Sequence, residues 1–161
     1  MTDAVGRIVA VAASGAVAAA VVVLPSGCSS GAGCRAASVH VVPPHVTDTK
    51  AAFDVSATLT ASGHPVSGAN LAFWGWGRPP GQTSSVGTPL GSAVTNAVGT
   101  ATLHVPAQGA ADVNALGRLS GTEFVRVSVD FGVTRLGGQA YCAAKGEAQV
   151  ACGTGECTVS R

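Results

Sequence analysis

Two tryptophans, two residues apart, are the side chains of this chain best suited to hold a ligand. Trp74 and Trp76 share a parity on a predicted strand, so their rings lie on one face of it. Two exposed indoles on one strand can stack against a sugar ring or anchor a protein partner, and Arg78 beside them belongs to the same patch. In the alternative interpretation, the proline-containing loop from Gly77 to Gly87 folds over both rings and buries them.

Catalytic chemistry has little support in the sequence. Residues 38–161 contain no Gly-x-Ser-x-Gly nucleophile elbow, and the glycines follow turn patterns rather than a phosphate-binding strand-to-helix junction. No two of the eight carboxylates are spaced for acid–base catalysis. The histidines, which we expect at the surface or in turns, are scattered: His40, His45, His64 and His104. We therefore predict a non-catalytic protein without cofactor or metal; the alternative is a secreted hydrolase or inhibitor with an unrecognised site.

Five cysteines require an explanation, because an odd number in an exported protein gives one of them a separate role. If Cys28 has that role, the other four can form two disulfides in one of three pairings. We favour Cys152 with Cys157, across a glycine-containing turn, and Cys34 with Cys142. The spacing of Cys152 and Cys157 also falls within the loose range of zinc ligands, but no second close pair of ligands accompanies them.

Residues 1–27 have the layout of an export signal. A short polar lead that contains Arg7 precedes an uncharged stretch from Ile8 to Leu24, and small residues follow. The stretch is just long enough to span a bilayer as a helix, so the segment is either a cleaved signal peptide or a retained membrane anchor.

The segment that ends at Cys28 resembles the cleavage motif of bacterial lipoproteins. It reads Leu24-Pro25-Ser26-Gly27-Cys28, with the leucine four residues before the cysteine rather than the usual three. The resemblance implies that the Cys28 sulfur is lipidated and holds the protein at the membrane through its N-terminus. Residues 28–37, rich in Gly, Ser and Ala, would then be a flexible tether in front of one domain at 38–161.

Composition narrows the class of protein further. Charged residues make up 11% of the chain and aromatic residues 4%, and the net charge is +1. This balance gives no electrostatic footprint for nucleic acid. Small and β-branched residues dominate instead, and they suit short strands joined by tight turns.

Alternation of apolar and polar residues predicts strands along most of the chain. Period two is clearest at Ala52 to Ala61, Thr100 to Val105 and Glu123 to Phe131. In the last of these we expect Val125, Val127, Val129 and Phe131 to face inward. Further strands are predicted at Ser38 to Val42, Asn70 to Trp76, Pro89 to Thr95 and Gln139 to Ala143, and a short helix within Ala110 to Leu119. About seven short strands with one wet face each predict an all-β antiparallel sandwich.

Two segments resemble the signatures of bacterial immunoglobulin-like domains, the kind repeated in invasins and intimins. Leu59 to Phe73 resembles the strand–turn–strand signature, and Thr95 to Leu103 resembles the second, a hairpin leading into a strand. The resemblance covers about residues 50–106, in a single copy. It implies an immunoglobulin-like fold at the cell surface, without catalytic residues. It also places Leu71 and Phe73 in the core, so Trp74 and Trp76 would face outward toward an unknown protein or carbohydrate ligand.

Overall fold

The computed structural model describes residues 33–107, 115–153 and 157–159, and these form an all-β protein. The predicted signal or anchor segment and Cys28 lie outside the described residues. The strands are β1 (Ala37–Val41), β2 (His45–Val46), β3 (Phe53–Ala61), β4 (His64–Pro65), β5 (Asn70–Arg78), β6 (Val86–Val94), β7 (Thr100–Val105), β8 (Glu123–Phe131), β9 (Thr134–Leu136), β10 (Gln139–Tyr141), β11 (Ala144–Gln149) and β12 (Ala151–Cys152). One short 3-10 helix, η1, spans Ala115–Leu119 in the described part of the chain.

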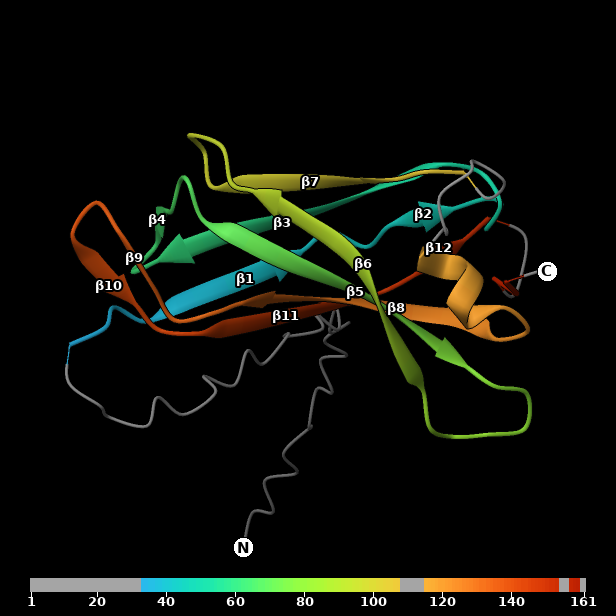
Figure 1. Ribbon diagram of the computed structural model, residues 1–161. Helices are drawn as coiled ribbons and strands as arrows, with labels where there is room; N and C mark the ends of the chain where they lie inside the picture. The colour runs from blue at the N-terminus through green and yellow to red at the C-terminus, as the bar shows by residue number, and fades with distance from the viewer. Residues whose placement is uncertain (1–32, 108–114, 154–156, 160–161) are drawn as a thin grey trace, which may run out of the picture.

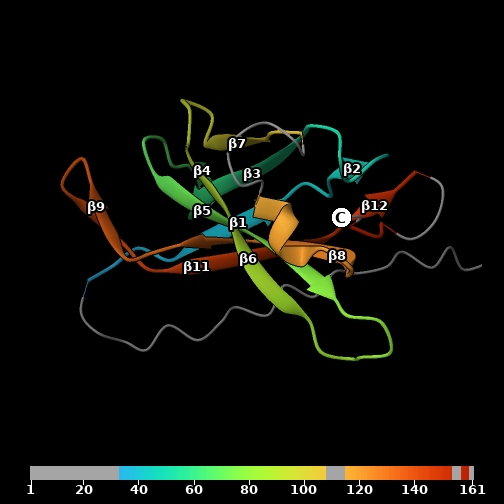
Figure 2. The same cartoon turned by 45° about the vertical axis from the view of Figure 1, so that its right-hand side comes forward.

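Two antiparallel four-stranded sheets form the body of the protein. In the first, β3 pairs with β1 on one side and with β7 and the short β4 on the other. In the second, the order is β11-β8-β5-β6. In both views of the ribbon, β3 and β7 lie in the upper layer, whereas β8 and β11 lie in the lower one (Figure 1 and Figure 2). The remaining pairs are small: the β9–β10 hairpin and the parallel contact of β12 with β2.

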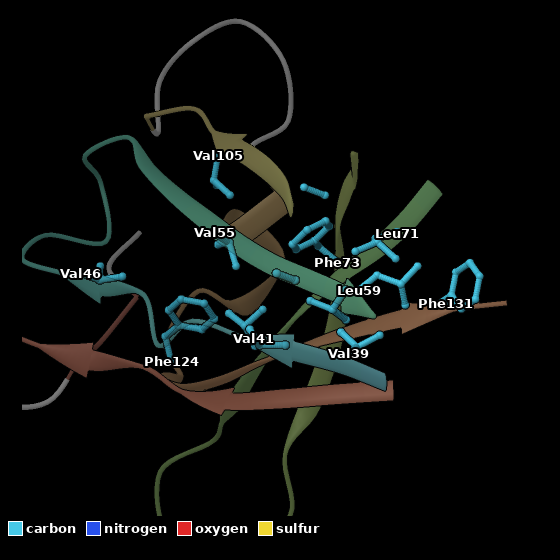
Figure 3. Close-up of a cluster of buried hydrophobic side chains, with 14 of the residues drawn as sticks. Val39, Val41, Val46, Val55, Leu59, Leu71, Phe73, Val105, Phe124 and Phe131 are labelled. Atoms are coloured by element: carbon cyan, nitrogen blue, oxygen red, sulfur yellow. The ribbon is translucent and has the colours of Figure 1, made fainter. Parts of the chain in front are cut away.

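The core lies between the two sheets and is built from the alternate residues that the sequence pattern predicts. On β3, the buried residues Val55, Ala57 and Leu59 alternate with more exposed hydroxyl side chains. From the other sheet, Leu71 and Phe73 of β5 pack into the same cluster (Figure 3). Each of the seven predicted strands overlaps a strand of the structure. The described end of the predicted helix is η1, a 3-10 helix, and the rest of that prediction lies outside the described residues.

The start of β8 departs from the predicted alternation. Trp76 of β5 pairs with Arg126, but the next residue, Gly77, pairs with Phe124, so Val125 is an extra residue in β8. Such a bulge shifts the alternation of side chains on its strand. Phe124 therefore packs in the core cluster, whereas Val125, which we expected to face inward, is buried but lies outside that cluster. Alternation resumes beyond the bulge with Val127 and Val129 inside.

Two disulfides fasten the chain, and they are the pairing that the sequence favours. Cys34 is bonded to Cys142, and Cys152 is bonded to Cys157. Because both cysteines of the close pair are in a disulfide, they are not free thiolate ligands for zinc. The first disulfide and a bridge of Arg35 to β10 also hold the last part of the expected tether, so the folded domain begins before residue 38.

Within the described ranges, no helix is both long and apolar enough to cross a membrane.

Candidate functional site

Charged and aromatic side chains gather on the outer face of the β11-β8-β5-β6 sheet. We call this surface the tryptophan face. Its residues are Trp74, Trp76 and Arg78 of β5; Glu123, Arg126 and Asp130 of β8; and Lys145 and Glu147 of β11. Half of the Asp, Glu, Lys and Arg side chains in the described ranges lie here. In a chain with so few charges, this concentration marks the face as the main polar surface of the fold.

Both tryptophans lie on this outer face, on the opposite side of β5 from Leu71 and Phe73. The prediction of the direction in which they point is therefore confirmed. Both are half-buried. The loop between β5 and β6 projects away from the body of the protein (Figure 1). Of the expected covering segment, Gly77 to Gly87, the last residue, Gly87 of β6, lies against the Trp76 ring. What partly covers Trp76 comes from the neighbouring strands instead.

Trp76 is held in place from several sides. Its indole Nε1 donates a 2.8 Å hydrogen bond to Oγ of Ser128, a residue with no exposed surface. The guanidinium carbon of Arg126 lies 4.6 Å from the centre of the ring, within cation–π range, and Nζ of Lys145 lies 5.7 Å from it. On the β6 side, a side chain at Gly87 would come within 3.0 Å of the ring, so the glycine makes room for it. Trp76 is thus a fixed part of the sheet surface.

Glu147 of β11 ties the two cations together. One of its carboxylate oxygens lies 3.0 Å from Nζ of Lys145, and the other lies 3.7 Å from the Arg126 guanidinium. All three side chains keep a third or more of their surface exposed, so each pair contributes little to stability by itself. Their combined effect is to hold Arg126 and Lys145 over Trp76.

Trp74 has a different environment, although it is only two residues away. Its neighbours across the sheet are Pro89 on β6 and Ser128 on β8, and the Ser128 hydroxyl is already bonded to Trp76. Among the described residues, no cation or aromatic ring stacks on Trp74, and no side chain or carbonyl accepts a hydrogen bond from its indole N–H. Trp74 therefore offers a partly exposed aromatic surface with an unused donor.

The bulge in β8 accompanies a hollow at one end of the tryptophan face. The hollow has a volume of about 470 Å³. Its lining is Arg78, Glu123, Phe124, Val125, Gln149, Val150 and Cys152. An ion pair at the rim joins Arg78 to Glu123 at 3.7 Å, and the extra residue Val125 gives the hollow an apolar part. The hollow is open to solvent, so it suits one part of a larger ligand rather than an enclosed small molecule.

The outer face of the other sheet is different in kind. It carries rows of hydroxyl groups, including Ser56 with Thr102 at 2.8 Å, and one exposed pair, His104 with Asp54 at 2.8 Å. No serine or threonine hydroxyl among the described residues hydrogen-bonds to the His104 ring, so the pair lacks the nucleophile of a triad. Cross-strand hydroxyl pairs of this kind stabilise a sheet, and we assign them that role.

Sequence reasoning found Trp74, Trp76 and Arg78, and the structure brings all three onto one face. The alternation that turns Val127 and Val129 inward also turns Arg126 and Asp130 outward, but nothing in the sequence connects these two residues with the tryptophans. Sequence reasoning missed Lys145 and Glu147, because β11 was not predicted as a strand. It missed the hollow as well. The hollow accompanies the bulge in β8, and a bulge depends on how two strands pair, which the sequence of one strand does not show.

The chain matches none of the protein-family models and no curated protein sequence.

Proposed function

We propose that this protein is a non-catalytic binding module with an immunoglobulin-like β-sandwich fold, exported and held at the cell surface through its N-terminus. Its ligand-binding surface is the tryptophan face. The observation that carries the proposal is the contrast between the two rings: Trp76 is fixed by Ser128, Arg126 and Lys145, whereas Trp74 beside it is left without a stacking partner. A partly exposed indole next to a rigid polar surface is the arrangement of a binding anchor.

Three features support the proposed fold, export and membrane anchor. The two disulfides fit an oxidising compartment such as the outside of a cell. The two packed antiparallel sheets and the turn segments around Gly63 and Gly99, both with positive φ, agree with an immunoglobulin-like domain. The signal-like N-terminus and the lipoprotein-like motif at Cys28 supply the route of export and the anchor.

Binding to the cell envelope tests the proposal. The purified full chain, kept in detergent so that its N-terminus is occupied, is mixed with detergent-washed cell-wall material from its own host. We expect the wild type to sediment with this material and Trp74→Ala to lose at least tenfold in affinity. Thr102→Ala, on the opposite face, serves as the matched control and should bind like the wild type.

Both variants should remain folded and lose no more than about 1 kcal/mol in the free energy of unfolding, because neither position belongs to the core cluster and a cross-strand pair such as Ser56–Thr102 contributes at most about that much. Equal binding of Trp74→Ala and the wild type would overturn the assignment of the tryptophan face. An absence of binding by the wild type would overturn the envelope as the source of the ligand.

A further inference from the structure

The ligand of the tryptophan face can be specified by its chemistry. We propose that it is a neutral polysaccharide, with one sugar ring stacked on Trp74 and another sugar, further along the same chain, in the hollow beside Arg78. This inference rests on the proposed function and narrows it to one class of ligand.

The balance of charge on the face favours a neutral, hydroxyl-rich ligand. The cations Arg78, Arg126 and Lys145 each lie within 4 Å of a carboxylate, so the face carries its charges as ion pairs rather than as a field of one sign. A polyanion or polycation would meet as much repulsion as attraction on such a surface. Sugar hydroxyl groups both donate and accept hydrogen bonds, so they can use the cations and the carboxylates alike.

The distribution of apolar residues argues against a protein partner. Interfaces between proteins have an apolar centre surrounded by a polar rim. The large exposed apolar residues are instead dispersed over different parts of the described chain: Val42, Val86, Val94, Val98 and Val133. On the tryptophan face, the partly exposed ring of Trp74 lies beside Pro89 and Ser128, and most of the other side chains of this face are charged. One aromatic ring among polar groups matches a sugar, which has a C–H face and a rim of hydroxyl groups.

The geometry of β5 extends the site beyond one sugar. Trp74 and Arg78 lie on the same side of this strand and four residues apart, a distance of about 13 Å along an extended chain. Between them lies Trp76 with the Arg126 guanidinium over it, which supplies donors at an intermediate position. The hollow at the far end offers Gln149, whose side chain is exposed, beside the ion pair of Arg78 and Glu123. A linear polymer can therefore contact Trp74 and the hollow at the same time.

Fractionation of the host cell wall tests this inference. One sample of wall is digested exhaustively with protease, which leaves its polysaccharide. A second is treated with trifluoromethanesulfonic acid, which removes glycans and leaves protein. We expect the wild type to bind the first sample and not the second, with the affinity for the first reduced at least tenfold by Trp74→Ala.

Two further readouts test the neutral ligand and the second sugar. Binding to the polysaccharide should change less than twofold when the salt concentration is raised, because ion pairing with the polymer is absent. Gln149→Ala should weaken binding several-fold, since the amide in the hollow is lost, while Thr102→Ala leaves it unchanged.

The outcomes separate this inference from the function on which it rests. If the wild type binds only the deglycosylated protein sample, and Trp74→Ala abolishes that binding, the tryptophan face is a binding surface but its ligand is a protein. Loss of polysaccharide binding at high salt would show a charged polymer and overturn the neutral ligand. Normal binding by Gln149→Ala would overturn the sugar position in the hollow.

Discussion

Two identical side chains on one strand acquire different roles through their neighbours. Trp76 lies beside a buried hydroxyl and beneath two cations, and each of these contacts fixes the ring. Trp74 lies two residues earlier on the same face, next to a proline, and gains none of them. The alternation of β5 places both rings on one face of the strand, and the resemblance to immunoglobulin-like domains implies that this face is the outer one. The sequence cannot separate them, because the difference lies in cross-strand partners from β8 and β11.

Replacement of each tryptophan by phenylalanine separates these roles. Trp76→Phe removes the donor to Ser128, leaves a fully buried hydroxyl without its partner and weakens the contact with Arg126. We expect a loss of about 1–3 kcal/mol in the free energy of unfolding, measured by chemical denaturation. Trp74→Phe should stay within about 0.5 kcal/mol of the wild type, as a surface change does. Equal losses in the two variants would contradict the assignment of Trp76 as the fixed ring.

Thr95 is a second residue whose role depends on its neighbours, which in this case lie in a turn. Its hydroxyl accepts a 2.9 Å hydrogen bond from the Ala69 N–H and donates a 2.7 Å bond to the Val66 carbonyl, and the side chain is buried. It therefore links the turn before β5 to the end of β6.

Thr95→Val keeps the shape of the side chain but removes both bonds. It should cost about 1–3 kcal/mol in the free energy of unfolding. Thr60→Val, at a half-buried position on the outer face of β3, is the control and should change the same quantity by less than 1 kcal/mol. If the two variants lose the same free energy of unfolding, Thr95 does not stabilise the protein by linking the turn before β5 to the end of β6.

At the scale of strands, the sequence predicts the strands whose buried side carries large or branched side chains. β3 and β7 alternate clearly, and their predicted bounds lie within one residue of the observed ones. β11 escapes prediction because its inward residues are Ala144, Gly146 and Ala148, which give almost no apolar signal. These small residues have a structural reason, since β1 of the other sheet lies close against β11.

Gly146 marks the closest approach of β1 and β11. A side-chain carbon at this position would lie 2.5 Å from the Val39 carbonyl oxygen, too close for either strand to keep its place. Gly146→Ala should therefore push the two edges apart and lower the free energy of unfolding by about 1–3 kcal/mol. Gly132→Ala, with no atom within 4 Å of the added carbon, should have little effect. Denaturation curves that coincide for the two variants would show that the edges are free to separate.

At the scale of the whole molecule, the start of the described chain and the hollow lie at opposite ends of β11. The Cys34–Cys142 disulfide holds the start of the described chain just before β11 begins, whereas Gln149 at the end of β11 lines the hollow. Across this strand the separation is about 17 Å. A protein anchored through its N-terminus would thus present the hollow away from the membrane, where a cell-wall polymer can reach it.

The two disulfides should differ in what they contribute. Cys34 and Cys142 are 108 residues apart, so their bond restricts the unfolded chain far more than the bond between Cys152 and Cys157, which are 5 apart. Replacement of both cysteines by alanine should cost roughly 4–5 kcal/mol for the long loop and about 2 kcal/mol for the short one, in the chain-entropy description. Urea denaturation of the two double variants measures both losses, and a larger loss for the short loop would contradict this account.

The effects of the two disulfides on ligand binding should rank in the opposite order to their effects on stability. Cys152 lines the hollow, so loss of its disulfide frees that wall and should weaken polysaccharide binding several-fold. Loss of the Cys34–Cys142 bond alters the opposite end of β11, and it should leave binding to the folded protein unchanged. The same two variants, assayed under conditions where both are folded, thus distinguish the end of the domain at the Cys34–Cys142 disulfide from the end proposed to meet the ligand. If the long-loop variant lost binding instead, the tryptophan face would depend on the Cys34–Cys142 end, and the separation of the two ends would not hold.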